Sequence, residues 1–444
     1  MIFESRPRRY LIETWGCQMN QHDTEKMAGI LVDLGYAPTT DENEADLILL
    51  NTCSVREKAE SKVFGRLGRL RRLKKSNPEL LLGVVGCVAQ QSGEGIFRRA
   101  PYVDLVMGPR NLARLGQLIE EARREGHSIG LARDDDPIIF PTGTTARASG
   151  PKAFVTVMEG CNKSCTYCIV PFTRGREVYR PHEEILREVR DLTAHGYVEI
   201  EFLGQNVNAY HDGQRDLASL LRMADRVQGV RRVRFTTSHP GHLKQGIMDA
   251  LRSVPTVCNH LHLPAQSGSD RVLRSMNRGY TRARYLAKIG YLRKTVPDIA
   301  FSTDIIVGFP GETESDFQDS LALLREVEYD QVFAFAYSPR PGTEAPRLDS
   351  ALPENVKQAR LRELLALQES IQVRRNRGLI GRTFEVLVDG TGRLDNGLLK
   401  GRTRCNRIVH FPGPACRGDL VDVRITRAHA HSLIGETGPT RGAA

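Results

Sequence analysis

Short apolar runs alternate with amphipathic segments along the first 126 residues. Each run has the length of a buried strand, and each is followed by a stretch in which apolar residues recur at helical spacing. Strands that alternate with helices in this way are typical of a doubly wound α/β sheet. We therefore predict such a domain over residues 8–126. The apolar runs are YLIET, DLILLN, LLGVVG and VDLVMG.

A second series of strand-like runs fills residues 151–378, with helical patterns between the runs and a long helical pattern at the end. Six strand-then-helix units predict a curved, partial (β/α)6 barrel with its chemistry at the carboxyl ends of the strands. The intervening residues 127–150 are rich in Pro, Gly, Thr and charge without periodicity, which predicts a linker. The strand-like runs are AFVTVME, YVEIEFLG, RVRFTT, CNHLHLP, AFSTDIIVGF and YDQVFAFAYS.

Beyond Gly378 the pattern changes to alternating apolar and polar residues separated by glycine-rich turns. A period of two indicates strands with one buried face. We therefore predict a small antiparallel β-barrel over residues 379–442. The alternating segments are RTFEVLVDG, LLKGRTRCNRIVHF and DLVDVRITRAHAHSLIGE.

The composition indicates the class of protein, its location and its partners. With 26% charged and 40% hydrophobic residues, the 444-residue chain has the make-up of a soluble globular protein of two or three domains. No run approaches about eighteen apolar residues and the start lacks a signal peptide, so we expect a cytoplasmic protein with no membrane partner. The net charge of +10 favours a polyanionic partner such as nucleic acid, although an ordinary basic surface would give the same value.

Cysteine provides the most specific chemistry. Nine cysteines in a reducing compartment are more often metal-binding or catalytic than disulfide-bonded. Cys161, Cys165 and Cys168 follow the first predicted barrel strand with C-x3-C-x2-C spacing. Zinc normally takes four protein ligands, and this loop offers no fourth Cys or His. A cubane iron-sulfur cluster held by three cysteines leaves one iron open for a substrate or cofactor, and this is the site we predict.

The spacing and position of this motif resemble the radical S-adenosylmethionine enzymes. In that family the open iron binds S-adenosylmethionine, and an electron from the cluster cleaves it to a 5′-deoxyadenosyl radical. Two further segments resemble the family's cofactor-binding stretches, namely FLGQNV at 202–207 and STDIIVGFPGET at 302–313. The cofactor contacts that the resemblance implies are Gly204, Gln205, Asn206, Asp304 and Gly308.

A second set of cysteines is spread over the N-terminal domain. Cys17, Cys53 and Cys87 each come directly after a predicted strand. Loops at the carboxyl edge of adjacent parallel strands lie together, so three thiolates can meet there without a local motif. A second cluster with an open iron is the expected occupant, and small buried cysteines that merely end strands are the alternative. The other cysteines show no such arrangement and are predicted to be structural; they are Cys258, Cys405 and Cys416.

Two basic regions are candidates for contact with nucleic acid. The predicted helix FGRLGRLRRLKK at 64–75 carries six basic residues, for which a solvated face is the plainer explanation. The segment LKGRTRCNRIVHF of the C-terminal barrel resembles the TRAM domain of RNA-modifying enzymes, and small barrels of this type bind oligonucleotides on a strand face. This segment interleaves Arg402, Arg404 and Arg407 with strand residues and with His410 and Phe411.

In order and in wording, the three parts resemble the radical S-adenosylmethionine methylthiotransferases. Long segments such as NTCSVREKAESKVFGRLG and MEGCNKSCTYCIVPFTRGRE carry the resemblance. It implies an enzyme that methylthiolates C2 of N6-isopentenyladenosine next to the anticodon of tRNA. One S-adenosylmethionine would methylate a sulfur on the N-terminal cluster, and a second would provide the radical at the barrel cluster.

The same resemblance implies two [4Fe-4S] clusters as cofactors beside S-adenosylmethionine. The implied partners are the tRNA anticodon stem-loop, a low-potential electron donor and iron-sulfur cluster assembly or carrier proteins. Methylthiolation of another tRNA adenosine or of a ribosomal-protein aspartate is the alternative within the enzyme class. A non-catalytic iron-sulfur regulator that binds RNA is the alternative from a different class.

Overall fold

The computed structural model describes residues 6–54, 58–132, 145–147, 150–348, 350–392 and 397–437. It separates into two compact units, and the chain passes between them several times. No helix in these described ranges is long and apolar enough to cross a membrane. The first unit takes Met1–Ser149, Glu159–Lys163 and Ile169–Val178, and the second takes Gly150–Met158, Ser164–Cys168 and Tyr179–Ala444.

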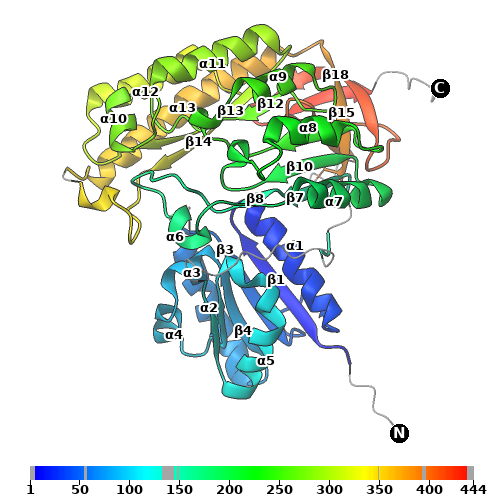
Figure 1. Ribbon diagram of the computed structural model, residues 1–444, viewed down its shortest axis with the longest axis vertical. Helices are drawn as coiled ribbons and strands as arrows, with labels where there is room; N and C mark the ends of the chain where they lie inside the picture. The colour runs from blue at the N-terminus through cyan, green and yellow to red at the C-terminus, as the bar shows by residue number, and fades with distance from the viewer. Residues whose placement is uncertain are drawn as a thin grey trace. The chain divides into compact units, whose positions relative to one another are not determined.

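The first unit is built on a six-stranded sheet in which every neighbouring pair is parallel. The strand order is β2-β1-β3-β4-β5-β6 with helices on both faces (Figure 1), which confirms the predicted doubly wound fold. β6 falls among the residues expected to form a linker, and residues 133–144 of that linker lie outside the described ranges. The strands are β1 (Arg9–Trp15), β2 (Ala37–Pro38), β3 (Leu47–Thr52), β4 (Leu81–Gly86), β5 (Leu105–Met107) and β6 (Ser128–Gly130).

Strand β3 shows why this sheet has a core on each face. Leu47 and Leu49 pack into one core with residues of α1 and α5, whereas Ile48 and Leu50 pack into the other core with residues of α2. A central parallel strand is buried on both faces, so its sequence is apolar without alternation. The helices of this unit are α1 (Gln18–Asp33), α2 (Lys58–Ser76), α3 (Cys87–Ser92), α4 (Gly95–Arg99), α5 (Leu115–Glu125) and α6 (Val170–Arg174), with the 3₁₀ helix η1 (Pro109–Arg114).

The second unit begins with the six strands predicted from the sequence. They form two parallel three-stranded sheets, β11-β10-β7 and β12-β13-β14, and a bridge between Val233 and Val257 joins the two. The resulting order, β7-β10-β11-β12-β13-β14, is that of a curved, partial (β/α)6 barrel, as expected. The strands are β7 (Lys152–Thr156), β10 (Glu199–Leu203), β11 (Arg232–Phe235), β12 (His260–His262), β13 (Ala300–Val307) and β14 (Gln331–Ala336).

Helices cover the outside of these strands in Figure 1, and their apolar faces share one large core with the sheets. The long helix α13 packs against both β14 and α12. The predicted strand AFVTVME divides into β7 and the short strand β8 (Met158–Glu159), which pairs with β9 (Val178–Tyr179); this pairing was not predicted. The helices are α7 (His182–Ala194), α8 (Leu217–Asp225), α9 (Gln245–Ser253), α10 (Asp270–Ser275), α11 (Arg282–Thr295), α12 (Glu314–Val327) and α13 (Glu354–Arg377), with the 3₁₀ helices η2 (Val207–Ala209), η3 (Pro240–His242) and η4 (Ala345–Arg347).

The chain ends in a closed five-stranded barrel, β15-β16-β17-β19-β18. Four of its pairings are antiparallel, as predicted, and the pairing of β17 with β19 is parallel. Small aliphatic residues such as Val386 and Val409 fill the interior. The strands are β15 (Thr383–Thr391), β16 (Leu399–Thr403), β17 (Ile408–Phe411), β18 (Leu420–Ala428) and β19 (Leu433–Thr437).

Two arginines of β11 attach this small barrel to the base of the larger one. The fully buried Arg232 donates to the carbonyl oxygen of Arg402 over 2.8 Å and to the carboxylate of Glu385 over 2.8 Å. Arg234 donates to the carbonyl oxygens of Thr403 and Arg404 over 2.8 and 2.9 Å. The amino-terminal part of β11 is therefore fastened to the C-terminal barrel.

Candidate functional site

The three N-terminal cysteines lie at the carboxyl ends of adjacent strands. Cys17 follows β1 and precedes α1, Cys53 follows β3, and Cys87 is the first residue of α3 after β4. Because β1, β3 and β4 are neighbours in the sheet, the three loops lie along one stretch of its edge. The structure therefore brings this set of cysteines together.

The approach of these loops is close enough for the thiols to affect one another. A Cβ atom on Gly16 would come within 2.8 Å of the Cβ atom of Cys53, so only glycine fits at that position. Hydrogen bonding with Cys53 lowers the pKa of Cys17 to about 6, whereas burial raises the pKa of Cys87. A thiol with such a lowered pKa is ionised at neutral pH, and the thiolate is the form that binds iron.

Two asparagines fix the loop that carries Cys17. The Sγ atom of Cys17 lies 3.2 Å from Oδ1 of Asn20, whose Nδ2 donates to Oδ1 of Asn51 over 3.1 Å. Asn51 in turn donates to the backbone carbonyl of Asn20 over 2.8 Å. We did not predict these residues, although each stands within three positions of a candidate cysteine in GCQMN and NTC.

The C-x3-C-x2-C loop contributes to both units. Cys161 belongs to the first unit, where its amide donates to the carbonyl oxygen of Gly175 over 3.0 Å. Cys165 and Cys168 belong to the second unit, where the amide of Cys168 donates to the carbonyl oxygen of Cys165 over 3.0 Å. The buried Arg278 donates through Nη1 to the Sγ atom of Cys165, and no local motif in the sequence pointed to this arginine.

The segment FLGQNV contains the last two residues of β10 and the loop after them, at the carboxyl end of the partial barrel. Gly204 directly follows the strand, and a Cβ atom on it would lie 2.6 Å from the sulfur of Met158. The amide of Asn206 donates to that same sulfur over 3.4 Å, and its Nδ2 lies 3.0 Å from Nδ1 of His242. Gly204, Gln205 and Asn206 thus lie at the end of the barrel where they were expected.

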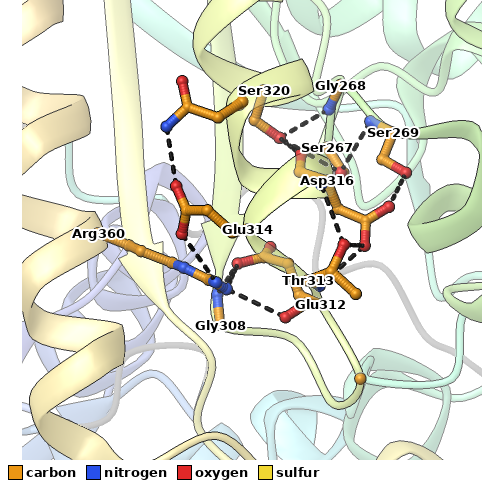
Figure 2. Close-up of polar contacts among 12 residues, drawn as sticks. Ser267, Gly268, Ser269, Gly308, Glu312, Thr313, Glu314, Asp316, Ser320 and Arg360 are labelled. Carbon is orange, nitrogen blue, oxygen red and sulfur yellow. Dashed lines mark hydrogen bonds and ion pairs between the residues drawn. The ribbon is translucent and has the colours of Figure 1, made fainter.

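The segment DIIVGFPGET ends β13 at Val307, and its residues after Val307 form a tight turn. Gly308 has a φ of +70°, and its amide donates to Oε1 of Glu312 over 2.8 Å (Figure 2). A Cβ atom at this position would lie 2.3 Å from Cγ of Lys357. The packing of α13 and the left-handed backbone therefore explain the glycine without reference to a bound ligand. Arg360 of α13 completes the turn by donating to Oε1 of Glu312 over 2.7 Å.

Asp316 connects this turn to the loop that follows β12. As Figure 2 shows, its carboxylate accepts from the hydroxyls of Ser269 and Thr313, each over 2.6 Å, and from the Thr313 amide over 2.8 Å. The Thr313 side chain accepts from the Asp316 amide in return, so the pair forms the capping box of α12. These bonds hold the loops after β12 and β13 in one arrangement.

The inner face of the partial barrel offers a polar group and an aromatic ring side by side. Asp304 and Phe333 are partners in the register of β13 and β14. The Asp304 side chain is 28% exposed and Phe333 is 39% exposed, whereas Ile305 and Val332 on the opposite face are buried in the core. Nε2 of His262 lies 3.5 Å from Oδ2 of Asp304.

Three residues of the basic barrel segment LKGRTRCNRIVHF have structural roles. Arg404 donates to the carbonyl oxygens of Pro255 and Val257 over 2.6 and 2.8 Å, which docks the small barrel on the larger one. Arg407 forms an ion pair with Asp330. Phe411 is fully buried in the barrel core. Arg404 and Arg407 are thus engaged in contacts within the second unit and Phe411 in the barrel core, and a sequence period does not reveal which face of a barrel meets a neighbouring part of the chain.

The basic helix is likewise partly structural. Arg66 pairs with Glu13 and Glu42, and Nζ of Lys74 pairs with Asp104 over 2.9 Å. The remaining basic residues of this stretch are exposed, as a solvated face requires; they are Arg69, Arg71, Arg72 and Lys75.

Comparison with known families divides the chain as its fold does. Residues 9–108 match the uncharacterized protein family UPF0004, residues 155–324 match the radical SAM superfamily, and residues 377–437 match the TRAM domain. Among solved structures, the radical S-adenosylmethionine methyltransferase TsrM from Kitasatospora setae has a TM-score of 0.56 at 14% identity and covers 76% of this chain and 74% of its own. The cobalamin-dependent radical enzyme OxsB has a TM-score of 0.53 at 12% identity over 82% of this chain and 56% of its own. These likenesses show the fold.

Full-length relatives are much more similar. A tRNA-2-methylthio-N(6)-dimethylallyladenosine synthase from Moorella thermoacetica is 47% identical over 97% of this chain and 98% of its own. Proteins of the same name from Burkholderia ambifaria and Clostridium novyi are 47% and 45% identical over 97% of this chain and 97% and 96% of their own. With this identity along nearly its whole length, the chain belongs to the tRNA-2-methylthio-N(6)-dimethylallyladenosine synthase family of radical SAM proteins.

Proposed function

We propose that this enzyme methylthiolates C2 of N6-isopentenyladenosine next to the anticodon of tRNA. The observation that carries the proposal is the full-length similarity to synthases of that name, in a chain that has two separate sets of three cysteines. Two molecules of S-adenosylmethionine are used in each reaction, one as methyl donor and one as source of the radical. A cluster with three cysteine ligands has one iron free to bind a substrate or cofactor. An RNA-binding regulator without catalytic activity would not require such a free iron at either set of cysteines.

In this proposal each set of cysteines holds one [4Fe-4S] cluster. The first set is supported by its position at the ends of three adjacent strands and by the lowered pKa of Cys17, which suits a thiolate ligand. The second set is supported by its C-x3-C-x2-C spacing after β7. When bound, the clusters and S-adenosylmethionine supply the sulfur, the methyl group and the radical chemistry. The proposed ligands are Cys17, Cys53 and Cys87, and Cys161, Cys165 and Cys168.

The inner face of the partial barrel binds S-adenosylmethionine. Asp304 and the exposed ring of Phe333 would line this site, where the carboxylate would offer a hydrogen-bond acceptor and the ring an apolar surface to the cofactor. The turn at Gly308 fixes the position of the backbone that directly follows β13. The segment after β10 contributes Gly204, Gln205 and Asn206.

The macromolecular substrate is the tRNA anticodon stem-loop, in which unpaired bases can be turned out into a pocket. Exposed Arg424 and Arg427 on β18 provide positive charge for the phosphates. The remaining partners are a low-potential electron donor and iron-sulfur cluster carrier proteins, and the reaction takes place in the cytoplasm with tRNA. The proposed domain limits are 8–126 for the auxiliary cluster, 151–378 for the radical core and 379–442 for RNA binding, with 127–150 as linker.

The test is mass analysis of tRNA nucleosides from a deletion strain, with and without the gene restored. We expect the 2-methylthio group to disappear from N6-isopentenyladenosine and to return on complementation. In parallel, reconstituted protein with reductant should form 5′-deoxyadenosine. An unchanged nucleoside together with a lost modification on another adenosine or a ribosomal-protein aspartate would assign a different methylthiotransferase. Absence of 5′-deoxyadenosine would favour a non-catalytic regulator.

A further inference from the structure

A buried ion pair lies in the first unit and has no part in the function proposed above. Arg174 ends α6, and its Nη2 atom donates to Oδ2 of Asp23 on α1 over 2.5 Å. The two side chains are only 3% and 2% exposed. Taking two charges out of water is costly unless their remaining polar atoms are satisfied.

The pairing leaves half of each group unsatisfied. Nη1 of Arg174 and Oδ1 of Asp23 are buried, and neither has a hydrogen-bond partner among the described residues. Buried polar atoms in native proteins nearly always have a partner, so an exception needs an explanation such as a bound ion or ligand. Nη1 of Arg174 therefore has a donor available for a group that binds beside it.

The neighbours of Arg174 identify that group. Helix α6 packs against α3, which begins at Cys87 (Figure 1). The charge of Arg174 also acts on the thiols of Cys87 and Cys17. The guanidinium of an arginine stays protonated in proteins. Arg174 is thus a permanent cation at the first set of cysteines.

An iron-sulfur cluster held by three thiolates fits this donor. Such a cluster is anionic, and hydrogen bonds to its sulfur atoms are among the main determinants of its reduction potential. We propose that Arg174 is a positioning residue for the cluster of Cys17, Cys53 and Cys87, with Nη1 donating to one of its sulfur atoms. Asp23 holds the other edge of the guanidinium. The inference rests on the proposed function, since it requires a cluster at these cysteines.

The position of Arg174 in the chain links this cluster to the second set of cysteines. Arg174 stands six residues after Cys168 in the sequence. The carbonyl oxygen of the next residue, Gly175, accepts the hydrogen bond from the amide of Cys161. One turn of chain thus holds a cysteine of the radical motif through its backbone and reaches the auxiliary cluster through a side chain.

The test is an EPR-monitored redox titration of the auxiliary cluster. The parent is the full chain with Cys161, Cys165 and Cys168 changed to Ala, so that only one cluster loads. Positive charge and hydrogen bonds favour the reduced cluster, so Arg174→Gln should shift the reduced-to-oxidised ratio about tenfold toward the oxidised form, which is 59 mV for one electron. Arg176→Gln changes an exposed arginine two positions away and should leave the potential unchanged.

Asp23→Asn should shift the reduction potential of the auxiliary cluster in the opposite direction. Removing the negative member of the pair should raise the potential, and a packing defect has no reason to move the two variants in opposite directions. Potentials equal to the parent in both variants, at equal iron content, would overturn the inference. If Arg174→Gln does not load iron, Arg174→Lys and Asp23→Asn decide in its place by the same criterion. A parent that binds no iron would overturn the cluster assignment as well as this inference.

Discussion

The Nη1 atom of Arg278 donates a hydrogen bond to the Sγ atom of Cys165 over 3.2 Å, although 113 positions separate the two residues. Arg278 is 7% exposed, and its remaining N–H groups reach the hydroxyl of Tyr280 over 3.2 Å and the carbonyl oxygen of Pro264 over 3.4 Å. The cysteine loop of the second unit is thus tied to the segment that precedes α11. Its geometry depends on a residue that no local motif identifies.

Replacing Arg278 with Met should impair loading of the barrel cluster. Met keeps most of the volume but removes the donor that orients Cys165, and it leaves the Pro264 carbonyl without this partner. We expect lower iron content in a chain whose Cys17, Cys53 and Cys87 are changed to Ala, and a loss of about 1–3 kcal/mol of unfolding free energy. Iron analysis and urea unfolding measure the two effects. Arg274→Met alters a neighbouring exposed arginine and should change neither.

The two sets of cysteines should perform separable steps. A variant with Cys17, Cys53 and Cys87 changed to Ala should still form 5′-deoxyadenosine yet produce no methylthiolated tRNA. The variant with Ala at the other three positions should form no 5′-deoxyadenosine, but it should still accept a methyl group and release S-adenosylhomocysteine. Chromatography of both nucleosides and of digested tRNA gives all three readouts. Product from the first variant would show that its cysteines are structural.

The other three cysteines should not contribute to iron binding. Reconstituted protein should hold about eight iron atoms, as two cubane clusters require. Cys258 is buried and Cys405 accepts a hydrogen bond from Nη1 of Arg407 over 2.7 Å, so Ala suits the first and Ser the second. The triple variant with Cys416→Ala should retain the parent's iron content and Mössbauer spectrum. Loss of four iron atoms would place one of these residues in a cluster.

Asp316 should make the stability of the second unit depend on pH. Burial alone would raise the pKa of its carboxyl, but hydrogen bonds from Arg271, Ser269 and Thr313 hold it well below the ordinary value of 3.8. A lowered pKa in the folded state stabilises the fold above the ordinary value, and this contribution disappears as the pH falls below it toward the lowered pKa.

Asp316→Asn should therefore reduce the free energy of unfolding at pH 7 by about 1–3 kcal/mol. The difference from the parent should shrink as the pH drops below about 4. Urea unfolding at a series of pH values measures it. Asp319 is half-exposed on the same helix, so Asp319→Asn is the matched control and should have little effect at any pH. A pH-independent difference for Asp316→Asn would show that its charge is not involved.

Point variants should distinguish RNA contact from domain docking in the C-terminal barrel. Arg424 and Arg427 are exposed, so changing either to Ala should weaken tRNA binding and reduce the slope of log K against log salt by about one unit for each phosphate that is no longer neutralised. Arg404 donates to carbonyl oxygens of the larger barrel, so Arg404→Ala should leave the slope unchanged and hasten proteolytic release of the small barrel. The reverse pattern would place the RNA on the opposite face.

Most helices and strands could be predicted because the pattern of apolar residues within each segment reveals its type. The uninterrupted apolar residues of β3 and the alternation along β15 distinguish a buried parallel strand from a barrel strand. The parallel pairing of β17 with β19 could not be predicted, because strand direction depends on the path of the connection. The strand β9 was missed because two residues leave no measurable period, and β8 was not recognised as separate from β7 because its two residues continue the apolar run AFVTVME.

The cysteines of the candidate site could be proposed from the sequence because their spacing, or their position after a predicted strand, is a local feature. The loop of Cys161, Cys165 and Cys168 is a local motif, and strand ends gave the positions of Cys17, Cys53 and Cys87. The supporting residues follow a different rule. Arg278 and Arg174 reach cysteine loops through tertiary packing. The contacting residues lie far apart in the sequence, so no local pattern predicts the contacts. The sequence alone does not distinguish a buried arginine from an exposed one.

Attachment of the C-terminal barrel through Arg232 and Arg234 has an evolutionary consequence. Both arginines donate to main-chain carbonyl oxygens, which are present whatever side chain stands at positions 402, 403 and 404, and Arg232 also pairs with the side chain of Glu385. Arg404 reciprocates by donating to main-chain oxygens of the larger barrel. Mutations at outward positions of the small barrel that take no part in these contacts should therefore leave the joint intact, so the RNA-facing surface can change while the catalytic barrel keeps the same appended module.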